Sequence, residues 1–459
     1  MEAWILPMDE KYGRPWPTST LIFNGEIVSW YNLWGELLDY GQYLIGSLLQ
    51  EGKMGELGNE IASQASRLDK LFSRFNSLSL EDATNDELLS YYSELHNAYT
   101  DWFVIGGLVE PVGYAGERMA RELLPRLPEK EREEAFSLLT TTTRESFSRR
   151  ESIELLKIAG AKSEGMDVSA MLSEHAEKYH WLHNNYFSTE TLGADFFKSQ
   201  LENVLSDFPD PKAQIGKMEE DSASIKEGKR VLLGRLGLDG QGRALVELLD
   251  IFAWYQDFRK EYIMRMLHYL DLIMGEIGKR KGLTLEDVKC LLPEEIPSLF
   301  ISPPDHALIE ERKKRFLFHF DSQTGESLHG IGEWSLDMEE ELLGSSTHKE
   351  DIVELRGLIA NKGHAKGRAR VTMSAQDAKA IREGEILVTS MTTPDFVVAI
   401  KRAGAIVTNE GGILSHAAVI SREFGIPCIV GTRMATRVFK TGDLLEIDCE
   451  LGVVRRVPE

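Results

Sequence analysis

The sequence has few cysteines and no long apolar run. Its three cysteines, Cys290, Cys428 and Cys449, are scattered along 459 residues, so they suggest neither a disulfide framework nor a zinc site. No apolar run approaches the roughly 18–20 residues that a membrane-spanning helix needs. The N-terminus, Met1-Glu2-Ala3-Trp4, lacks the basic residues and apolar core of a secretory signal. These absences predict a cytoplasmic protein with no membrane segment and no metal site.

Positive charge is also scarce, and the deficit is uneven. The chain has 52 Lys+Arg against 74 Asp+Glu, a net charge of −22 at pH 7. From Ile352 onward there are 15 basic and 12 acidic residues, a net of +3, so residues 1–351 carry −25. Such an acidic region argues against nucleic acid as a partner. The length and the 42% of hydrophobic residues suit two to four globular domains.

The first two thirds of the sequence predict an N-terminal arm followed by helices. Residues 1–30 are rich in aromatic and turn residues, which favours an extended arm or a short hairpin. In residues 31–343 the apolar residues recur with helical spacing, which predicts an all-α domain. Within it, the segments Pro211–Arg235 and Gly242–Lys281 flank a glycine-containing break and predict a helical hairpin with a long second arm.

The last part of the sequence changes in character. Residues 321–350 mix Gly, Ser, Thr and charged residues and predict a linker, whose end we place at 344–353. A flexible chain of about 20–30 residues has an r.m.s. span of roughly 25–33 Å. Beyond it, β-rich and helical segments alternate, which predicts a compact α/β domain over residues 354–459. The expected strands are Arg368–Met373, Ile386–Thr389, Ala405–Thr408, Cys428–Gly431 and Leu444–Cys449, and the expected helices are Ala375–Arg382, Asp395–Arg402 and Ser415–Phe424.

The stretch from Gly411 to His416 joins one of these strands to one of these helices. Gly411 and Gly412 let the backbone come close to a ligand, and His416 then lies at or just inside a helix N-terminus. Unpaired N–H groups and the helix dipole favour an anion at that end. A neutral imidazole is a nucleophile at pH 7, so His416 could hold a phosphoryl group covalently. The alternative is an ordinary strand–turn–helix crossover that contains a satisfied histidine.

The segment from Leu355 to Val457 resembles the phosphohistidine swivelling domain of the phosphoenolpyruvate-utilising enzymes almost from end to end. The shared features, in order, are Leu355-Arg356-Gly357, Gly363 to Gly367, Glu383 to Val388, Thr393-Pro394, the Gly-Gly-x-x-Ser-His core, Arg422 to Pro427, Gly431-Thr432 and Thr441-Gly442-Asp443. One departure is Leu414, where the family usually has Thr. The resemblance implies a layered β/β/α fold.

The resemblance also implies roles for particular residues. His416 would be the phosphorylated catalytic residue, and Gly411, Gly412 and Ser415 would shape the phosphate loop and offer N–H or hydroxyl donors. Arg422 could pair with phosphate, although a structural ion pair is an equal alternative because it lies six residues further on. The layout is closest to phosphoenolpyruvate-synthase-like proteins and to the phosphohistidine subunit of phenylphosphate synthase.

A second group of candidate residues lies in the helical region, which resembles more weakly the helical domain before the swivelling domain in these relatives. An aromatic-rich segment and one arginine of the long helix could bind the acceptor: His180, Trp181, His183, Asn184, Asn185, Tyr186 and Arg259. The alternatives are a packed core for the aromatic residues and a charged helix face around Arg259. A metal site at His180 and His183 is disfavoured because no third ligand is near in sequence.

The chain shows no stretch that resembles the ATP-grasp domain or the metal-dependent barrel of the larger relatives. We therefore expect a phosphotransferase subunit that binds no cofactor itself. A partner ATP-grasp protein, holding ATP and magnesium, would charge His416, and the phosphoryl group would pass to a small-molecule acceptor. The rival interpretations are a non-catalytic binding or regulatory protein with a degenerate swivelling domain, and a carrier phosphorylated by phosphoenolpyruvate through a separate barrel protein.

Overall fold

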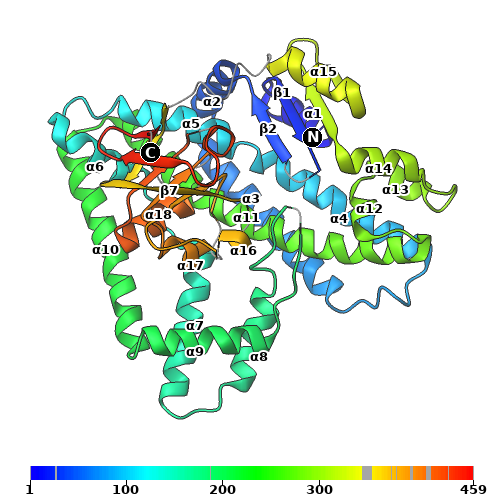
Figure 1. Ribbon diagram of the computed structural model, residues 1–459, viewed down its shortest axis with the longest axis horizontal. Coiled ribbons are helices and arrows are strands. Elements are labelled where there is room, and N and C mark those ends of the chain that lie inside the picture. The colour runs from blue at the N-terminus through cyan, green and yellow to red at the C-terminus, as the bar shows by residue number, and fades with distance from the viewer. Residues whose placement is uncertain are drawn as a thin grey trace. The chain divides into compact units, whose positions relative to one another are not determined.

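The computed structural model describes residues 2–25, 28–186, 188–343, 354–373, 375–378, 380–392, 396–409, 415–432 and 434–457. The chain divides into two compact units, Met1–Glu339 and Glu340–Glu459 (Figure 1). The first is mainly helical and the second is built on a sheet, so the predicted order of a helical region and a sheet region is confirmed at this level. No described helix is both long enough and apolar enough to cross a membrane.

The N-terminal unit is dominated by helices. They are α1 (Glu2–Tyr12), α2 (Trp34–Leu48), α3 (Lys53–Phe75), α4 (Asn85–Gly106), α5 (Val109–Arg121), α6 (Glu129–Thr140), α7 (Phe147–Ser163), α8 (Ser169–Tyr179), α9 (Ala194–Asp207), α10 (Pro211–Leu236), α11 (Gly240–Lys281), α12 (Leu285–Lys289), α13 (Glu295–Ser298), α14 (His306–Lys314) and α15 (Gly332–Leu343).

Helix α11 is the central element of this unit. It packs against α3, α4, α5, α6, α7 and α12, and buried residues recur along most of its 42 residues. The helix begins where the Asp239 side chain accepts a hydrogen bond from Gly242 N, and it ends at Gly282, whose φ of 70° suits glycine. Helix α10 ends in the same way at Gly237, with φ 56°. The predicted helical hairpin with a long second arm is therefore confirmed.

A four-stranded antiparallel sheet corrects the prediction that this unit is all-α. Its order is β2 (Val28–Asn32), β1 (Ser19–Phe23), β3 (Phe316–Phe320) and β4 (Ser327–Gly330). The β1–β2 hairpin was one of the two expectations for the N-terminal arm, but the arm also contains α1. Because β1 pairs with β3 almost 300 residues later, no local pattern could reveal the sheet.

The linker prediction for residues 321–350 is wrong over most of its length. Residues 327–343 form β4 and α15, and α15 is joined to the sheet by Arg315, whose Nε donates to Ser335 Oγ at 2.9 Å and whose guanidinium pairs with Glu339. Gly, Ser and charged residues therefore belong here to a tight turn and an exposed helix. The predicted linker end, residues 344–353, lies outside the described residues.

The C-terminal unit contains an eight-stranded mixed sheet with short helices. The strands are β5 (Glu354–Arg356), β6 (Leu358–Asn361), β7 (His364–Val371), β8 (Ile386–Thr389), β9 (Ala405–Thr408), β10 (Cys428–Val430), β11 (Leu444–Asp448) and β12 (Val453–Arg456), and the helices are α16 (Ala375–Ala378), α17 (Val397–Ile400), α18 (His416–Phe424) and α19 (Ala435–Val438). The strand order is β5-β12-β11-β7-β8-β9-β10-β6.

Strands β7, β8, β9 and β10 run parallel in the middle of this sheet, and β8 and β9 are buried on both faces. Leu387 and Ile406 point into a core shared with α17 and α18. Their neighbours Val388 and Val407 point into a second core, shared with α19 and with side chains of β5, β11 and β12. Alternation along each strand thus places different layers on the two faces of the parallel strands.

The close crossing of α2 and α5 supplies a stability prediction. A Cβ at Gly41 of α2 would lie 2.1 Å from the backbone oxygen of Pro111 in α5, whereas nothing lies within 4 Å of a Cβ at Gly46 on the same helix. We expect Gly41→Ala to lower the free energy of unfolding by about 1–3 kcal/mol, because backbone rather than a flexible side chain must move.

The control for this prediction is Gly46→Ala, which should raise the free energy of unfolding by up to about 1 kcal/mol through helix propensity. Urea unfolding of both variants beside the parent protein measures the difference. Equal stabilities for the two variants would show that α2 and α5 do not approach this closely.

Candidate functional site

The candidate phosphoryl-binding loop follows β9. The structure describes this strand to Asn409 and resumes at Ser415, so Gly411, Gly412 and Leu414 lie outside the described residues. Helix α18 begins at His416, as the sequence predicts, although the side chain of His416 is outside the described part. Ser415 is its N-cap, with extended backbone and with Oγ accepting a hydrogen bond from Ala418 N at 3.4 Å. His416 therefore occupies the first turn, where free N–H groups favour an anion.

Buried polar residues gather at the carboxyl ends of the parallel strands. Asn409 follows β9, and its side chain both donates to Thr436 Oγ1 at 2.6 Å and accepts from Thr436 N at 3.0 Å. Thr432, just after β10, donates from Oγ1 to Thr408 O at 2.8 Å. Thr389, at the end of β8, donates to Met391 O at 3.1 Å. These hydrogen bonds fix the strand ends at the edge where ligands bind in open α/β sheets.

The sequence gives only a weak signal for this polar edge, namely a polar residue directly after a buried apolar run. Thr389 closes β8, and Thr408 and Asn409 follow Ala405-Ile406-Val407. Such residues are common strand terminators, so the pattern alone does not separate a structural role from a ligand site.

Arg422 lies in the last turn of α18, at the end opposite to His416. Its Nε donates to Ala360 O at 2.8 Å, which ties the helix to β6, and burial lowers the pKa of its guanidinium. The helix then ends at Gly425, with φ 67°. This hydrogen bond to a backbone carbonyl gives Arg422 a structural contact, while the phosphate contact and the ion pair weighed in the sequence analysis both stay predictions.

Two glycines quoted in the resemblance have a steric reason in the fold. Gly384 has φ +81°, and its carbonyl oxygen would lie 2.4 Å from a Cβ at Gly367 and 2.7 Å from a Cβ at Gly404. A side chain at Gly367 would push β7 away from Gly384, and one at Gly404 would separate the segments that lead into β8 and β9. The glycine pattern thus maintains the close approach of these segments.

In the helical unit, two residues of the aromatic-rich segment anchor a loop. Trp181 is only 2% exposed, and its indole Nε1 donates to Lys178 O at 2.9 Å. Asn184 is 7% exposed; its Nδ2 donates to Met264 O of α11 at 3.0 Å, and its Oδ1 accepts from Glu190 N at 2.9 Å. Both side chains have internal partners, as a structural role requires.

The neighbouring residues of this segment are more exposed. Asn185 makes a turn through hydrogen bonds with the backbone and side chain of Ser188, each about 3 Å long. Nδ1 of His183 lies 3.5 Å from Glu190 Oε2, and Tyr186 is 49% exposed. No three His, Cys, Asp or Glu side chains among the described residues are grouped as metal ligands would be.

Arg259 of α11 is engaged by a carboxylate of the same unit. Its guanidinium forms a two-pronged ion pair with Glu110 of α5, one prong measuring 2.9 Å, and it also donates to Gly106 O. Burial opposes the charge, but Glu110 outweighs burial and raises the pKa of Arg259 above its usual value. An acceptor could reach this guanidinium only by competing with Glu110.

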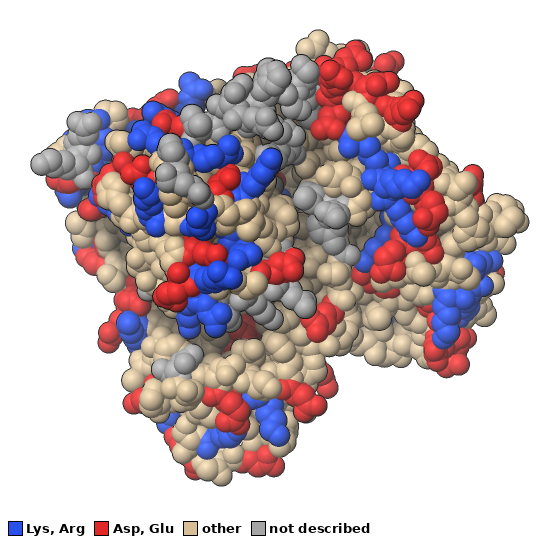
Figure 2. Space-filling model, viewed as in Figure 1, with Lys and Arg blue, Asp and Glu red and all other residues tan. Residues whose placement is uncertain are grey.

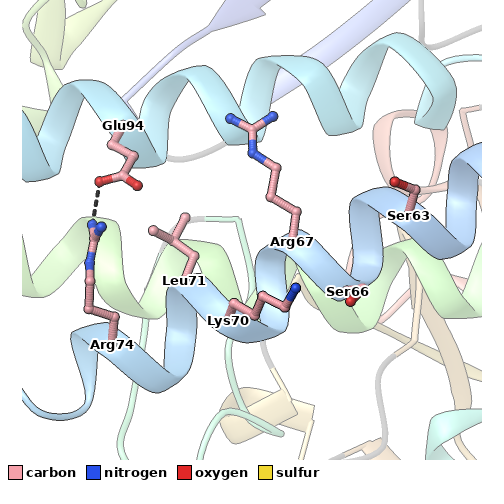
Figure 3. Close-up of a pocket in the computed structure, with 7 residues that line it drawn as sticks. All are labelled: Ser63, Ser66, Arg67, Lys70, Leu71, Arg74 and Glu94. Atoms are coloured by element: carbon pink, nitrogen blue, oxygen red, sulfur yellow. Dashed lines mark hydrogen bonds and ion pairs between the residues drawn. The ribbon is translucent and has the colours of Figure 1, made fainter.

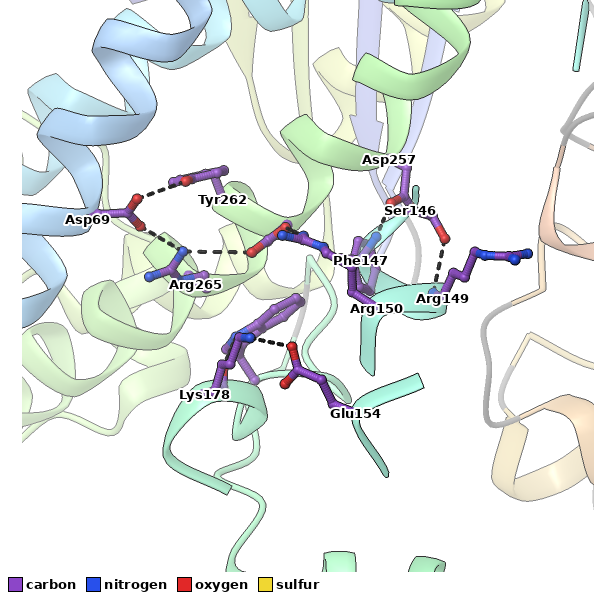
Figure 4. Close-up of polar contacts among 12 residues, drawn as sticks. Asp69, Ser146, Phe147, Arg149, Arg150, Glu154, Lys178, Asp257, Tyr262 and Arg265 are labelled. Atoms are coloured by element: carbon purple, nitrogen blue, oxygen red, sulfur yellow. Dashed lines mark hydrogen bonds and ion pairs between the residues drawn. The ribbon is translucent and has the colours of Figure 1, made fainter. Parts of the chain in front are cut away.

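Further along α11, a polar network connects neighbouring helices (Figure 4). Arg265 pairs with Asp69 of α3 at 2.9 Å and lies 3.8 Å from Glu261, which also pairs with Arg150 of α7. One turn earlier, Asp257 accepts a hydrogen bond from Phe147 N at 2.8 Å, while burial raises the pKa of its carboxyl group to about 6. This network holds α3 and α7 against α11.

His180 lies beside this network with its ring 4.3 Å from the ring of His268 on α11. Its Nδ1 is buried without a hydrogen-bond partner. Burial, followed by the proximity of His268 and Arg265, lowers the pKa of His180 to about 4, and burial also lowers the pKa of His268. Both rings are therefore neutral at pH 7.

This pair predicts a loss of stability in mild acid. The unfolded chain takes up a proton on His180 below its ordinary pKa of about 6.5, whereas the folded chain does so only near 4. The free energy of unfolding should fall as the pH drops through this window, by on the order of 1–2 kcal/mol. We expect His180→Gln to reduce this pH dependence and the exposed control His306→Gln to leave it unchanged. Urea midpoints from pH 7 to pH 4 test this, and an unchanged slope for His180→Gln would contradict it.

Acidic and basic side chains are interspersed over most of the face seen in Figure 2, and acidic side chains gather at α15. Among the comparisons with known proteins, the family match falls within the C-terminal unit. Residues 381–452 match the family described as PEP-utilising enzyme, mobile domain. The phosphoenolpyruvate synthase of Pyrococcus furiosus is 52% identical over 106 residues, which are 23% of this chain and 13% of that enzyme.

A longer match is the probable phosphoenolpyruvate synthase of Methanothermobacter thermautotrophicus, 35% identical over 203 residues, which are 40% of this chain and 28% of that protein. The chain thus spans less than a third of the length of either relative. A solved structure of Thermococcus kodakaraensis aconitase X aligns with 23% of this chain and with 98% of its own chain, at 18% identity. Its TM-score of 0.19 is too low to support a structural inference. The family match thus shows that residues 381–452 are similar to the mobile domain of PEP-utilising enzymes, and both relatives carry the name phosphoenolpyruvate synthase.

Proposed function

We propose that this chain is a phosphotransferase subunit that carries a phosphoryl group on His416. A separate ATP-grasp protein, which holds ATP and magnesium, charges the histidine, and the group then passes to a small-molecule acceptor bound by the helical unit. The observation that carries the proposal is the position of His416 as the first residue of α18, directly after the N-cap Ser415, in a domain of the matched family.

The chemistry requires three displacements at phosphorus. In the first, one imidazole nitrogen of His416 attacks the β phosphorus of ATP, an N–P bond forms, the P–O bond to AMP breaks, and the other ring nitrogen loses its proton to solvent. In the second, water attacks the γ phosphorus of the bound pyrophosphoryl group, the P–O bond between the two phosphorus atoms breaks, and inorganic phosphate leaves. In the third, an acceptor hydroxyl oxygen attacks the remaining phosphorus, the N–P bond breaks, and the released imidazole takes up the hydroxyl proton. Positioning and charge neutralisation dominate such transfers, and the N–H groups of the first turn of α18 supply part of both.

The decisive experiment uses the purified chain, its candidate ATP-grasp partner and ATP labelled separately at the β and γ phosphates. We expect acid-labile, alkali-stable label on the chain, transferred from the β position and lost in His416→Ala. His364→Ala, at an exposed histidine on β7 of the same unit, is the matched control and should retain the label.

The other outcomes distinguish the rival functions. Label in His416→Ala equal to that of the parent protein would overturn the assignment. Label obtained only from phosphoenolpyruvate with a barrel protein would replace the donor but keep the carrier. No label with either donor would favour the regulatory protein.

The N-cap of α18 supplies a second test. Ser415→Ala should lower the free energy of unfolding of the C-terminal unit by about 1 kcal/mol, because Ala418 N loses its partner. Ser415→Asp should keep the cap, since Asp is an equally good capping residue, but it adds negative charge next to the incoming phosphate. We therefore expect Ser415→Asp to slow phosphorylation of His416 by about tenfold or more. Thermal unfolding and labelling rates separate the two effects, and labelling by Ser415→Asp at the parent rate would argue against phosphate at this helix end.

A further inference from the structure

A basic groove lies between α3 and α4, apart from every residue discussed above as a functional candidate. It encloses about 570 Å³ and is lined by Ser63, Ser66, Arg67, Lys70, Leu71, Arg74 and Glu94 (Figure 3). Its basic and hydroxyl residues are separated by three or four positions along α3, so they share one face of that helix. Leu71 is buried, and the polar residues of α3 around it are exposed.

Two ion pairs mark the ends of the groove. Arg67 pairs with Asp101 at 2.9 Å, and Arg74 pairs with Glu94; both carboxylates belong to α4. The four side chains are between 40% and 58% exposed, and ion pairs this exposed are weak and readily exchange partners. The two guanidinium groups can therefore turn toward a bound anion at little cost.

Lys70 lies between these pairs. Its side chain runs along α3 toward Ser66 (Figure 3), and among the described residues the structure gives its ammonium group no carboxylate partner. Asp69, its neighbour in sequence, is engaged elsewhere by Arg265 and by the hydroxyl of Tyr262. Three cations thus face two carboxylates, and cations at this helical spacing repel one another until an anion neutralises them.

The donor set indicates which anion fits. Guanidinium groups present paired N–H donors that match the oxygens of phosphate, and a lysine adds a point charge. Ser63 and Ser66 add hydroxyl donors on the same face. The excess of positive charge is notable because residues 1–351 carry a net charge of −25. The simpler alternative is a solvated helix face whose arginines only join α3 to α4, but that role requires neither Lys70 nor a concave groove.

We propose that this groove binds the phosphate group of a small phosphorylated molecule, with Lys70 as its central contact and Arg67 and Arg74 on either side. The remaining volume of the groove would hold the organic part of the ligand. The inference stands on the groove alone and does not depend on phosphorylation of His416.

The test is calorimetric titration of the full chain at low ionic strength with inorganic phosphate, pyrophosphate and citrate. We expect saturable binding of phosphate or pyrophosphate that is weakened at least tenfold in Lys70→Glu and in Arg67→Ala. The matched control is Lys226→Glu, which reverses the charge of an exposed lysine on α10 and should bind as the parent protein does. His416→Ala should also bind normally, so failure here and failure of the carrier assignment are distinguishable.

Three results would overturn the proposal. They are the absence of saturable binding of phosphate and pyrophosphate, equal binding by Lys70→Glu and the parent protein, and tight binding of citrate alone, which would make the groove a carboxylate site. Circular dichroism of each variant confirms that α3 remains helical, so that lost binding reports on the groove.

Discussion

The helical unit depends on the pairing of charges along α11. A helix covered by six others cannot leave a charged side chain without a partner, because an unpaired buried charge costs several kcal/mol. Four of these helices supply such a partner, and each pair fixes where its helix lies along α11. The pairs are Arg259 with Glu110 of α5, Glu261 with Arg150 of α7, Arg265 with Asp69 of α3, and Asp271 with Lys289 of α12. Apolar packing alone would allow these helices to slide by a turn, whereas the pairs select one register.

The C-terminal unit meets a different constraint. Its parallel strands are buried on both faces, so the polar groups at their ends must find partners locally or lie at a ligand site. The Asn409 side chain bonds to the hydroxyl and the backbone N–H of Thr436, and the Thr432 hydroxyl donates to Thr408 O. In the first turn of α18, Ser415 Oγ satisfies Ala418 N, whereas the N–H groups of His416 and Ala417 have no acceptor within the helix. An anion at that helix end would complete their hydrogen bonding, as the proposed phosphoryl carrier requires.

How much the sequence could predict follows from the range of each interaction. Strands β8 and β9 begin and end where the sequence places them, because a short β-rich run between turns is a local signal. The α10–α11 hairpin is also predicted from a local signal, which is the glycine-containing break between two segments of helical spacing. The four-stranded sheet of the N-terminal unit is not, because β1 and β3 are far apart in the chain and each is too short to be distinctive. Nor does the sequence reveal that Arg259 is paired with Glu110, since spacing along one helix carries no information about its neighbours.

These internal pairings also bear on where a ligand can bind in the helical unit. A side chain whose donors are already engaged must give up those bonds to bind a ligand, and an abandoned buried partner costs about 1–3 kcal/mol, more when it is charged. Asn184 and Arg259 are engaged in this way. An exposed lysine whose ammonium group is still hydrated has no protein hydrogen bond to give up. The exposed ion pairs beside it lose little free energy when they open. The exposed cations of α3 are therefore more available to an anionic ligand than Asn184 and Arg259, which the sequence brings to attention.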